Sequence, residues 1–374
     1  MDDIRLQEGE IKNNVLVGKD GYLFLYEGAH NQFSYLSGKK IVSQESISNF
    51  HENIKNRKVY LANLGIQYKH VVFPSKPLLK SKYLPDKWGV VNSLFNTYYK
   101  DLHSGTVIYP LEELLECEKK HSTFLKYNSH ITNYASLVIS SLILKNLNLR
   151  YDIRFDFKLC KQEIIGGDLA TMYGINIYHE EEVLIYTKKV DLFEAHNYDA
   201  IPGNTNHIHI IRNNNAINDK KVLIFGDSFF VDFTLRDVFK YYFREIVYIR
   251  SQYLHNDIVD LYMPDIVLTG NTERYLANVD SDTNANNILM ELYGNAKYRP
   301  SLKYLCALKS VLFQRYYPKQ YGKWRENPNL DNDFFLDYNT NETNRYIKKY
   351  KKYKRISMFL GIMILFFVLF GVIK

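Results

Sequence analysis

The chain has 374 residues, which is enough for one large domain or two medium ones with a sizeable core. Lys and Arg number 48 against 41 Asp and Glu, giving a net charge of +7. Seven basic residues lie in the last 27 positions, which contain no acidic residue, so the body of the chain is neutral overall. This distribution argues against nucleic acid as the partner of the folded body.

The N-terminus and the cysteines indicate a reducing compartment. Residues 1–14, MDDIRLQEGEIKNN, contain no apolar stretch of the kind found in secretory signals. Cys117, Cys160 and Cys306 are well separated and odd in number, which fits free thiols better than a disulfide framework. We therefore expect the body of the protein to lie in the cytoplasm.

The first half of the chain alternates strand and helix patterns. Two strands around a turn are predicted at 15–26, and a buried strand that ends at Pro74 is predicted at 68–73. Helices are predicted at 43–64, 91–104 and 136–149. A short strand followed by the start of a helix is predicted at 106–116.

The second half continues this alternation after a less regular region. Residues 151–220 are rich in Asn and His, with a possible hairpin at 181–193. Strands are predicted at 221–225, 244–250 and 265–270, and helices at 229–243 and 255–263. The pattern predicts an α/β fold with a doubly wound, mostly parallel sheet and helices on both of its faces.

The C-terminal region predicts a linker and a membrane anchor. Residues 276–347 read as helices and polar loops, with an Asn- and Asp-rich linker at 327–344. Residues 356–373, ISMFLGIMILFFVLFGVI, carry no charge and would form a helix of about 27 Å, close to the thickness of a bilayer core. A buried core helix is the alternative. Six basic residues before this segment favour keeping that side in the cytoplasm.

The most informative short stretch is KVLIFGDSFF, residues 221–230. It places Ser228 where a predicted strand turns into a predicted helix, at the edge of the sheet where ligands bind in doubly wound folds. Gly226 would permit the tight bend, and the first amides of the helix would favour developing negative charge. The alternative is that Asp227 or Ser228 only caps the helix.

A serine nucleophile needs a base, and His130 is the best candidate among eleven histidines. It lies in FLKYNSHITNYAS, two positions after Asn128 and just before an apolar helix. A surface or capping histidine is the alternative. The chain shows neither a cluster of metal ligands nor a phosphate-binding glycine loop, so no metal is expected.

Several stretches together resemble the SGNH-hydrolase-like O-acetyltransferases of bacterial polysaccharides, the group that includes the alginate O-acetylation proteins. These stretches occur in the family's order over about residues 15–277, and the histidine motif precedes the serine, unlike in ordinary GDSL esterases. They are VGKDGYLFL, VVFPSKPLLKSKYLP, YNSHITNYAS, GGDLATM, VLIFGDSF and PDIVLTGNTERYL.

The resemblance implies a triad that moves an acetyl group onto or off a sugar hydroxyl. Ser228 would be the nucleophile and His130 the general base, whereas the family's aspartate falls on Asn128. A neutral amide can fix the histidine tautomer but stabilises an imidazolium less well than a carboxylate does. A slower enzyme, recruitment of another carboxylate, and a degenerate site all remain open.

Other site residues are carried over with alternatives. Asn271 is a candidate oxyanion donor, because SGNH enzymes use an asparagine side chain there, or else a turn residue. Asp227 is expected to order the turn. Lys76 and Arg274 are candidates for holding an acidic sugar or the acyl donor, or else have structural roles.

These features lead to one functional hypothesis. The protein is expected to be an O-acetyltransferase of a bacterial surface polysaccharide or its lipid-linked precursor, with acetyl-CoA as donor and no bound cofactor. Glycan-assembly proteins are possible partners. The alternatives are a carbohydrate esterase of the same fold and a noncatalytic glycan-binding subunit. The expected organisation is a catalytic domain (1–277), a helical extension and linker (278–347) and an inner-membrane anchor (348–374), with a periplasmic body as the alternative placement.

Overall fold

A computed structural model of the chain describes residues 6–88, 90–100, 105–149, 156–203, 205–231, 238–326 and 352. The chain divides into two compact units, Met1–Tyr304 and Leu305–Lys374. The first unit therefore extends past the predicted domain boundary at residue 277. In the second unit, Trp324 is buried and stacks on Tyr321.

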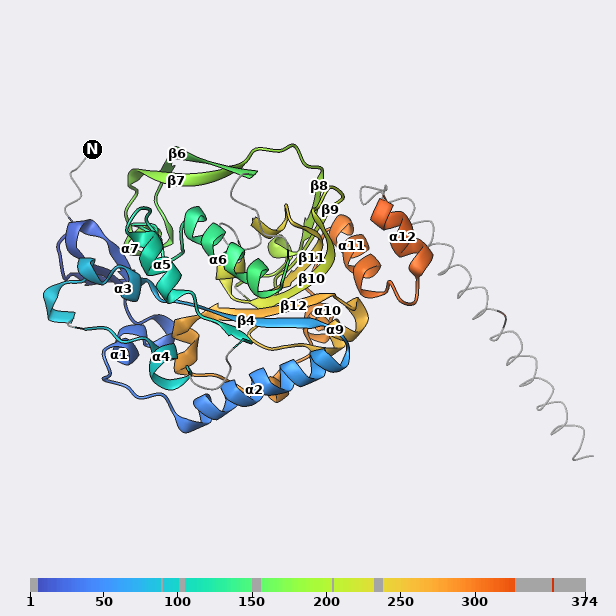
Figure 1. The fold of residues 1–374 in the computed structure, drawn as a ribbon, viewed down its shortest axis with the longest axis horizontal. Helices are drawn as coiled ribbons and strands as arrows, with labels where there is room; N and C mark the ends of the chain where they lie inside the picture. The colour runs from blue at the N-terminus through green and yellow to red at the C-terminus, as the bar shows by residue number, and fades with distance from the viewer. Residues whose placement is uncertain are drawn as a thin grey trace, which may run out of the picture. The chain divides into compact units, whose positions relative to one another are not determined.

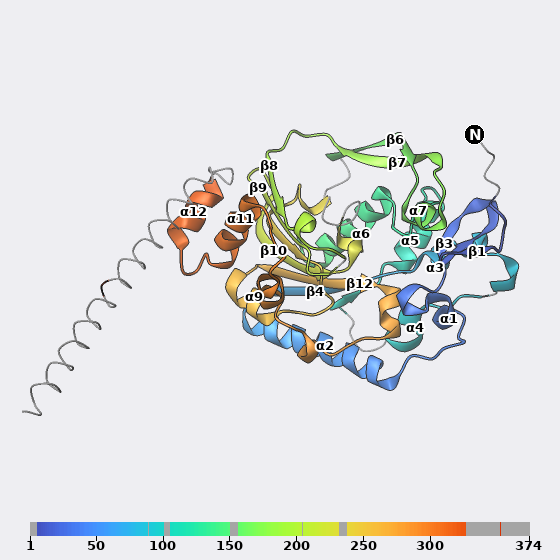
Figure 2. The same ribbon diagram turned by 180° about the vertical axis from the view of Figure 1, so that it is seen from behind.

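The first unit is built on a seven-stranded sheet with the order β5-β4-β12-β10-β11-β9-β8 (Figures 1 and 2). The five strands from β5 to β11 are parallel, whereas β9 and β8 are antiparallel to their neighbours. The strands of this sheet are β4 (Gln67–Phe73), β5 (Val107–Ile108), β8 (Leu192–His196), β9 (Ile208–Asn213), β10 (Asn218–Gly226), β11 (Phe243–Ile249) and β12 (Ile266–Thr272).

Helices cover both faces of the sheet, as the sequence predicted. Helix α2 lies on one face, and α5 and α6 lie on the other (Figure 1). The helices are α1 (Gln32–Leu36), α2 (Gln44–Asn63), α3 (Lys76–Leu79), α4 (Leu94–Tyr98), α5 (Leu111–Glu118), α6 (Asn133–Asn146), α7 (Asp168–Tyr173), α9 (Asn256–Tyr262), α10 (Ile288–Gly294), α11 (Leu302–Leu312) and α12 (Pro318–Glu326).

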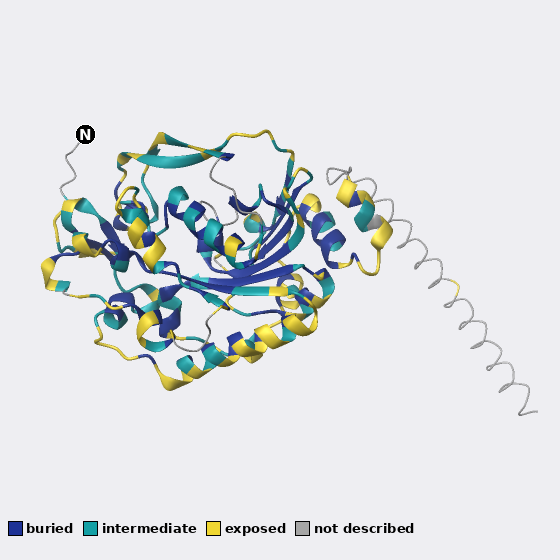
Figure 3. Ribbon diagram, in the orientation of Figure 1, coloured by how far each residue is buried: buried dark blue, intermediate teal, exposed yellow. Residues whose placement is uncertain are grey.

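Helix α2 shows how the sequence determines these layers. Ser43 caps its N-terminus by accepting a hydrogen bond from the Ser46 amide, and Gly65 follows its end with a left-handed φ of 71°. Phe50, Ile54 and Leu61 recur at helical spacing on its buried face, whereas its outer face is exposed (Figure 3).

Two smaller sheets flank the central one. Strands β1 (Ile11–Lys12), β2 (Val15–Val17) and β3 (Leu23–Leu25) form an antiparallel sheet, and the predicted strand–turn–strand at 15–26 is confirmed there. Strands β6 (Phe157–Ile165) and β7 (Tyr178–Tyr186) form an antiparallel ribbon with α7 between them in sequence.

The middle of the chain differs from the prediction. The hairpin predicted at 181–193 is wrong, because β7 pairs with β6, whereas β8 joins the central sheet beside β9. Strand β9 was not predicted. Its six residues, IHIIRN, are all buried, so they lack the polar alternation that marks a half-exposed strand.

The predicted membrane segment, residues 356–373, lies outside the described residues. Within the described part of the chain, no helix combines the length and apolar character needed to cross a bilayer. Membrane attachment therefore remains a prediction from sequence.

Candidate active site

Ser228 lies at the carboxyl end of β10, the fourth strand of the sheet. It begins a 3-10 turn, η7 (Ser228–Phe230), and Val231 is already extended. The helix predicted to start at residue 229 is therefore not present at that position, and residues 232–237 of that prediction lie outside the described residues.

Gly226 lies in the bend, as predicted, and it is required there by the close approach of other groups. A Cβ there would collide with the Gly270 carbonyl oxygen and with the ring of Phe230. Gly270, which pairs with Gly226 across β10 and β12, is restricted in the same way by the Val71 carbonyl and by Phe230. The two glycines thus make room for Phe230, whose packing fixes the turn that carries Ser228.

Asp227 holds this turn to the end of β12. Its buried carboxylate accepts hydrogen bonds from the Phe229 amide at 3.0 Å and from the Thr272 amide at 2.8 Å. The Thr272 hydroxyl donates to the same carboxylate. Tyr248 donates to the Asp227 carbonyl at 3.0 Å. With these partners, Asp227 orders the turn and is not placed to transfer protons.

The structure brings Ser228 and His130 together, although they are 98 positions apart in sequence. The Ser228 hydroxyl lies 3.0 Å from His130 Nε2. The other ring nitrogen, Nδ1, lies 2.8 Å from the side-chain oxygen of Asn128. An amide oxygen can only accept, so Nδ1 carries the proton and Nε2 is free to accept the serine proton. The predicted trio therefore has the geometry of a nucleophile, a base and an orienting group.

A carboxylate that the sequence reading did not single out also faces this imidazole. Asp168 Oδ2 lies 3.5 Å from His130 Nδ1, too far for a strong hydrogen bond but close enough for charge to act. The Asp168 carboxylate accepts hydrogen bonds from the backbone amides of Ser129 and Leu169, each at 2.7 Å. The Ser129 hydroxyl donates to the same carboxylate.

Asp168 can lie close to His130 only because the residue before it, Gly167, has no side chain. Gly167 has φ 150°, and a Cβ at this position would overlap the Tyr127 carbonyl oxygen. The Ala170 amide donates to that same carbonyl at 3.2 Å. The start of α7 is thus pressed against the loop that carries His130. The motif GGDLATM was visible in the sequence, but only this contact shows which side chain its aspartate meets.

Lys76 stabilises the loop 123–132, which carries His130, through hydrogen bonds to its backbone. Its ammonium is buried and donates to the carbonyls of Leu23 and Leu125 at 2.7 Å, Asn128 at 2.9 Å and Lys126 at 3.1 Å. Burial lowers the pKa of Lys76 to about 7, an effect that the charge of Asp168 opposes. Because these carbonyls engage all its donors, Lys76 is placed to position the loop, in contrast to the substrate-binding role considered from sequence.

Arg274 and His30 lie near the serine turn. The Arg274 guanidinium is 5.9 Å from the Phe229 ring and 5.4 Å from the Tyr275 ring. The His30 ring lies 4.2 Å from that of Tyr275. Burial and the charge of Arg274 lower the pKa of His30, against the effect of Asp227. Among the described residues, no carboxylate pairs with Arg274, so its assignment to ligand binding stays a prediction.

Within the described part of the chain, no hydrogen bond joins Asn271 to Ser228 or His130. It lines a small cavity of about 30 Å³ together with α2 residues Phe50, Ile54 and Arg57. Its buried side-chain oxygen has no hydrogen-bond partner among the described residues. The oxyanion role predicted for Asn271 therefore stays a prediction.

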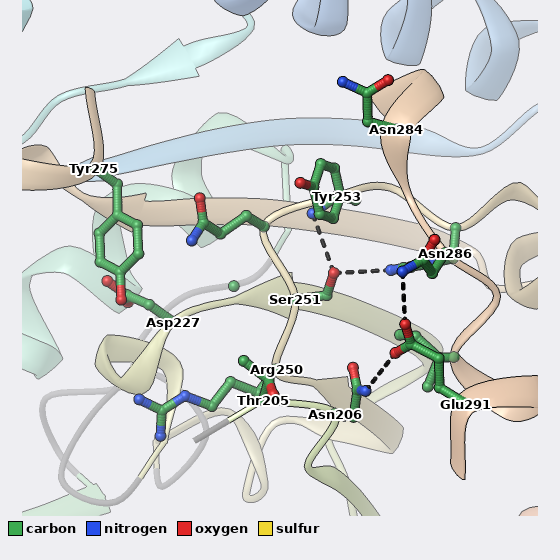
Figure 4. A pocket seen from close by; sticks show the side chains of 14 residues that line it. Thr205, Asn206, Asp227, Arg250, Ser251, Tyr253, Tyr275, Asn284, Asn286 and Glu291 are labelled. Carbon is green, nitrogen blue, oxygen red and sulfur yellow. Dashed lines mark hydrogen bonds between the residues drawn. The ribbon is translucent and has the colours of Figure 1, made fainter. Parts of the chain in front are cut away.

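A larger cavity of about 380 Å³ begins at Gly226 and Asp227 (Figure 4). Arg250 and Tyr253, just beyond β11, form a second wall, and Tyr275 projects into it from η8 (Glu273–Ala277). The cavity thus lies at the carboxyl ends of the parallel strands, next to the turn that carries Ser228. Within the described residues, no group of His, Cys, Asp and Glu is arranged to hold a metal ion.

Comparison with known proteins identifies the fold through solved structures, but the sequence comparisons assign no family. The chain matches no protein-family model and no curated protein. Its structure is similar to that of Bacillus cereus PatB1, with a TM-score of 0.50 and 16% identity over 71% of this chain and 97% of that chain. A DHHW family protein from Eubacterium siraeum matches with a TM-score of 0.49 and 14% identity over 73% of this chain and 95% of that chain.

A third similar structure is the O-acetyltransferase domain of Pseudomonas putida AlgJ. Its TM-score is 0.46, with 14% identity over 75% of this chain and 99% of that chain. Of these matches, the likeness to PatB1 is strong enough to show a shared fold. It confirms the α/β class with a large, mostly parallel sheet that the sequence predicted.

Proposed function

We propose that the protein is an O-acetyltransferase that forms an acetyl-enzyme on Ser228 and passes the acetyl group to a sugar hydroxyl. The observation that carries this proposal is the linked arrangement of Ser228 Oγ, His130 Nε2 and Asn128 Oδ1, at 3.0 and 2.8 Å. The ordered motifs that resemble polysaccharide O-acetyltransferases support the choice of acetyl transfer among serine chemistries.

In the first half-reaction, Ser228 Oγ attacks the acetyl carbonyl carbon while its proton moves to His130 Nε2. The tetrahedral intermediate collapses, the bond to the donor's leaving group breaks, and the leaving group takes the proton from Nε2. In the second half-reaction, a sugar hydroxyl gives its proton to Nε2 as its oxygen attacks the acetyl-enzyme. Ser228 then leaves and regains that proton.

In this proposal, Asn128 and Asp168 together perform the two functions of the usual triad carboxylate, which are to orient the imidazole and to stabilise its positive charge. Asn128 fixes the tautomer through its bond to Nδ1, but it adds no charge. Asp168, 3.5 Å from the same nitrogen, supplies the negative charge that stabilises the imidazolium formed in each half-reaction. Asp168 acts through His130, so it is a positioning residue.

The donor and the location are part of the proposal. Acetyl-CoA is the proposed donor, because three free cysteines fit a reducing compartment, where acetyl-CoA is available. The proposed acceptor is a surface polysaccharide or a lipid-linked precursor near the inner membrane. Protease added to spheroplasts should leave the body intact, whereas degradation there would contradict a cytoplasmic placement.

Intact-mass measurement tests the proposal directly. Purified protein mixed with acetyl-CoA should gain one acetyl group per chain, and Ser228→Ala should gain none. His130→Ala should also lose most of the acetylation. Acetylation that persists in Ser228→Ala, or its absence from the unmodified chain at every pH tested, would contradict the proposal.

A carbohydrate esterase is the second candidate, because the same acyl-enzyme can be resolved by water. Adding a glycan to the acetylated protein separates the two. A transferase yields acetylated glycan, whereas an esterase yields only free acetate. If both Ser228→Ala and His130→Ala keep full function in cells, the protein is instead a noncatalytic glycan-binding subunit.

A further inference from the structure

We infer that the 380 Å³ cavity beside the serine turn is a subsite for an acidic sugar unit of the acceptor, with Arg250 binding its carboxylate or phosphate. This inference rests on the proposed function, because it describes the acceptor of the same reaction. The volume falls within the range of about 300–1,000 Å³ that is usual for small-molecule sites.

The cavity wall is suited to hydroxyl groups and not to an acyl chain. Ile288 is the one aliphatic side chain among its lining residues. Amide and hydroxyl side chains dominate the rest of the wall (Figure 4). Such groups bind sugar hydroxyls by hydrogen bonds, whereas a site for a fatty acyl chain would be mainly apolar.

One end of the cavity presents a preformed carboxylate for hydroxyl binding. Glu291 accepts hydrogen bonds from the side-chain amides of Asn206 at 2.8 Å and Asn286 at 2.7 Å. Figure 4 shows these three side chains gathered away from Arg250. The amides hold the carboxylate in place, and a carboxylate fixed in this way can accept from a sugar hydroxyl.

The other end carries a positive charge without a matching anion. No carboxylate of the described residues lies within ion-pair distance of Arg250. Asp227, which shares the cavity wall, is already engaged by Thr272 and Phe229. Arg274 adds a second cation beside Tyr275. An anionic ligand group in the cavity would therefore meet Arg250, whose guanidinium can bind carboxylate or phosphate in bidentate fashion.

Binding of small probes by Ser228→Ala tests this subsite without any acetyl transfer. Ligand-observed NMR would compare glucuronate, glucose 1-phosphate, neutral glucose and coenzyme A. Both acidic sugars should bind about tenfold more tightly than glucose, because a charge-assisted bidentate pair contributes that difference. Coenzyme A should not displace them.

Matched variants identify the groups responsible. Arg250→Gln should remove the preference for acidic sugars and leave the weak binding of glucose unchanged. Glu291→Gln should weaken glucose and glucuronate equally and keep the preference. Lys55→Gln, an exposed charge on α2, serves as the control for loss of one positive charge. Thermal melting checks that each variant is folded.

Three results would overturn the inference. These are equal binding of glucose and glucuronate, a preference that survives in Arg250→Gln, and displacement of the sugars by coenzyme A, which would assign the cavity to the donor. None of these results depends on acetyl-enzyme formation. Failure of the proposed function would instead appear as an unmodified intact mass in the chain that retains Ser228.

Discussion

The imidazole of His130 receives its orientation and its charge stabilisation from different side chains. Asn128 contacts Nδ1 directly, whereas the Asp168 carboxylate lies slightly farther away and is anchored by Ser129. Among the described residues, Arg274, Asp227 and Lys76 also carry charge close to this site. The charge on Asp168 is therefore the feature of the site that can be changed with least disturbance to the hydrogen bonds of His130.

Asp168→Asn should slow acetyl-enzyme formation about tenfold, because a nearby negative charge stabilises the imidazolium. The acid limb of the pH–rate profile should move to lower pH. NMR titration of the ring and single-turnover rates measure the two effects. Adding Asn128→Asp in the same chain should restore both.

Ser129→Ala is the matched control for this experiment. It removes the Ser129 hydroxyl from Asp168 but leaves the carboxylate charge in place. Its rate and the acid limb of its pH–rate profile should stay near those of the unmodified chain. If Ser129→Ala reproduces the loss seen in Asp168→Asn, Asp168 has only a structural role.

Sequence reasoning reached part of this site and missed the rest for a physical reason. Ser228, His130 and Asn128 lie in short motifs whose residue types suggest their chemistry. Asp168 is 38 positions beyond His130, and its relevance depends on the close contact that Gly167 permits. For Lys76, the sequence left ligand binding and a structural role open, because the carbonyls that surround it come from segments distant in sequence.

At the scale of elements, the loop 123–132 is held by the buried ammonium of Lys76. Lys76→Met should lower the free energy of unfolding by on the order of 3 kcal/mol, because it leaves several buried carbonyls without a donor. Acetyl-enzyme formation should fall as well. Urea denaturation measures the stability. Lys82→Met, at an exposed position, should change it by less than about 0.5 kcal/mol.

The antiparallel edge of the sheet makes a prediction about acid stability. Glu194 on β8 accepts from His209 on β9 at 3.1 Å, and this hydrogen bond, with help from Lys240, lowers the pKa of Glu194 to about 2. A lowered carboxyl pKa stabilises the fold above its ordinary value near 4.5, and this stabilisation disappears as the pH falls toward 2.

Glu194→Gln should therefore cost about 1–2 kcal/mol of unfolding free energy at pH 7, a figure reduced for solvent screening because the side chain is 34% exposed. The difference from the unmodified chain should shrink between pH 4.5 and 2. Equilibrium unfolding at several pH values measures it. Glu180→Gln, at an exposed ion pair on β7, should show no such pH dependence, and an equal effect there would contradict the assignment.

The same edge marks the limit of the sequence prediction for the fold. Strands β4, β10, β11 and β12 are short apolar runs, and each was predicted within a few residues. Strands β8 and β9 contain Glu194, His209 and Arg212, polar residues that are satisfied by partners on neighbouring strands. Those partners are not adjacent in sequence, so the region read as irregular.

At the scale of the whole molecule, residues 348–374 should determine where the protein is found. The full chain should sediment with membranes and resist extraction by high salt, because its uncharged segment is long enough to span a bilayer. A chain that ends at residue 347 should appear in the soluble fraction and still form the acetyl-enzyme. A full chain that remains in the soluble fraction would contradict the anchor.

The separation of His130 and Ser228 along the chain has a practical consequence. Lys189 is exposed in the connection between β7 and β8, so a single tryptic cut there would leave the base and the nucleophile on different polypeptides. Neither fragment contains the complete central sheet, because β4 of the first pairs with β12 of the second. If two inactive fragments regain acetylation when they are mixed, the protein can serve as a complementation reporter. The amount of acetylation would then measure how much of the protein has reassembled.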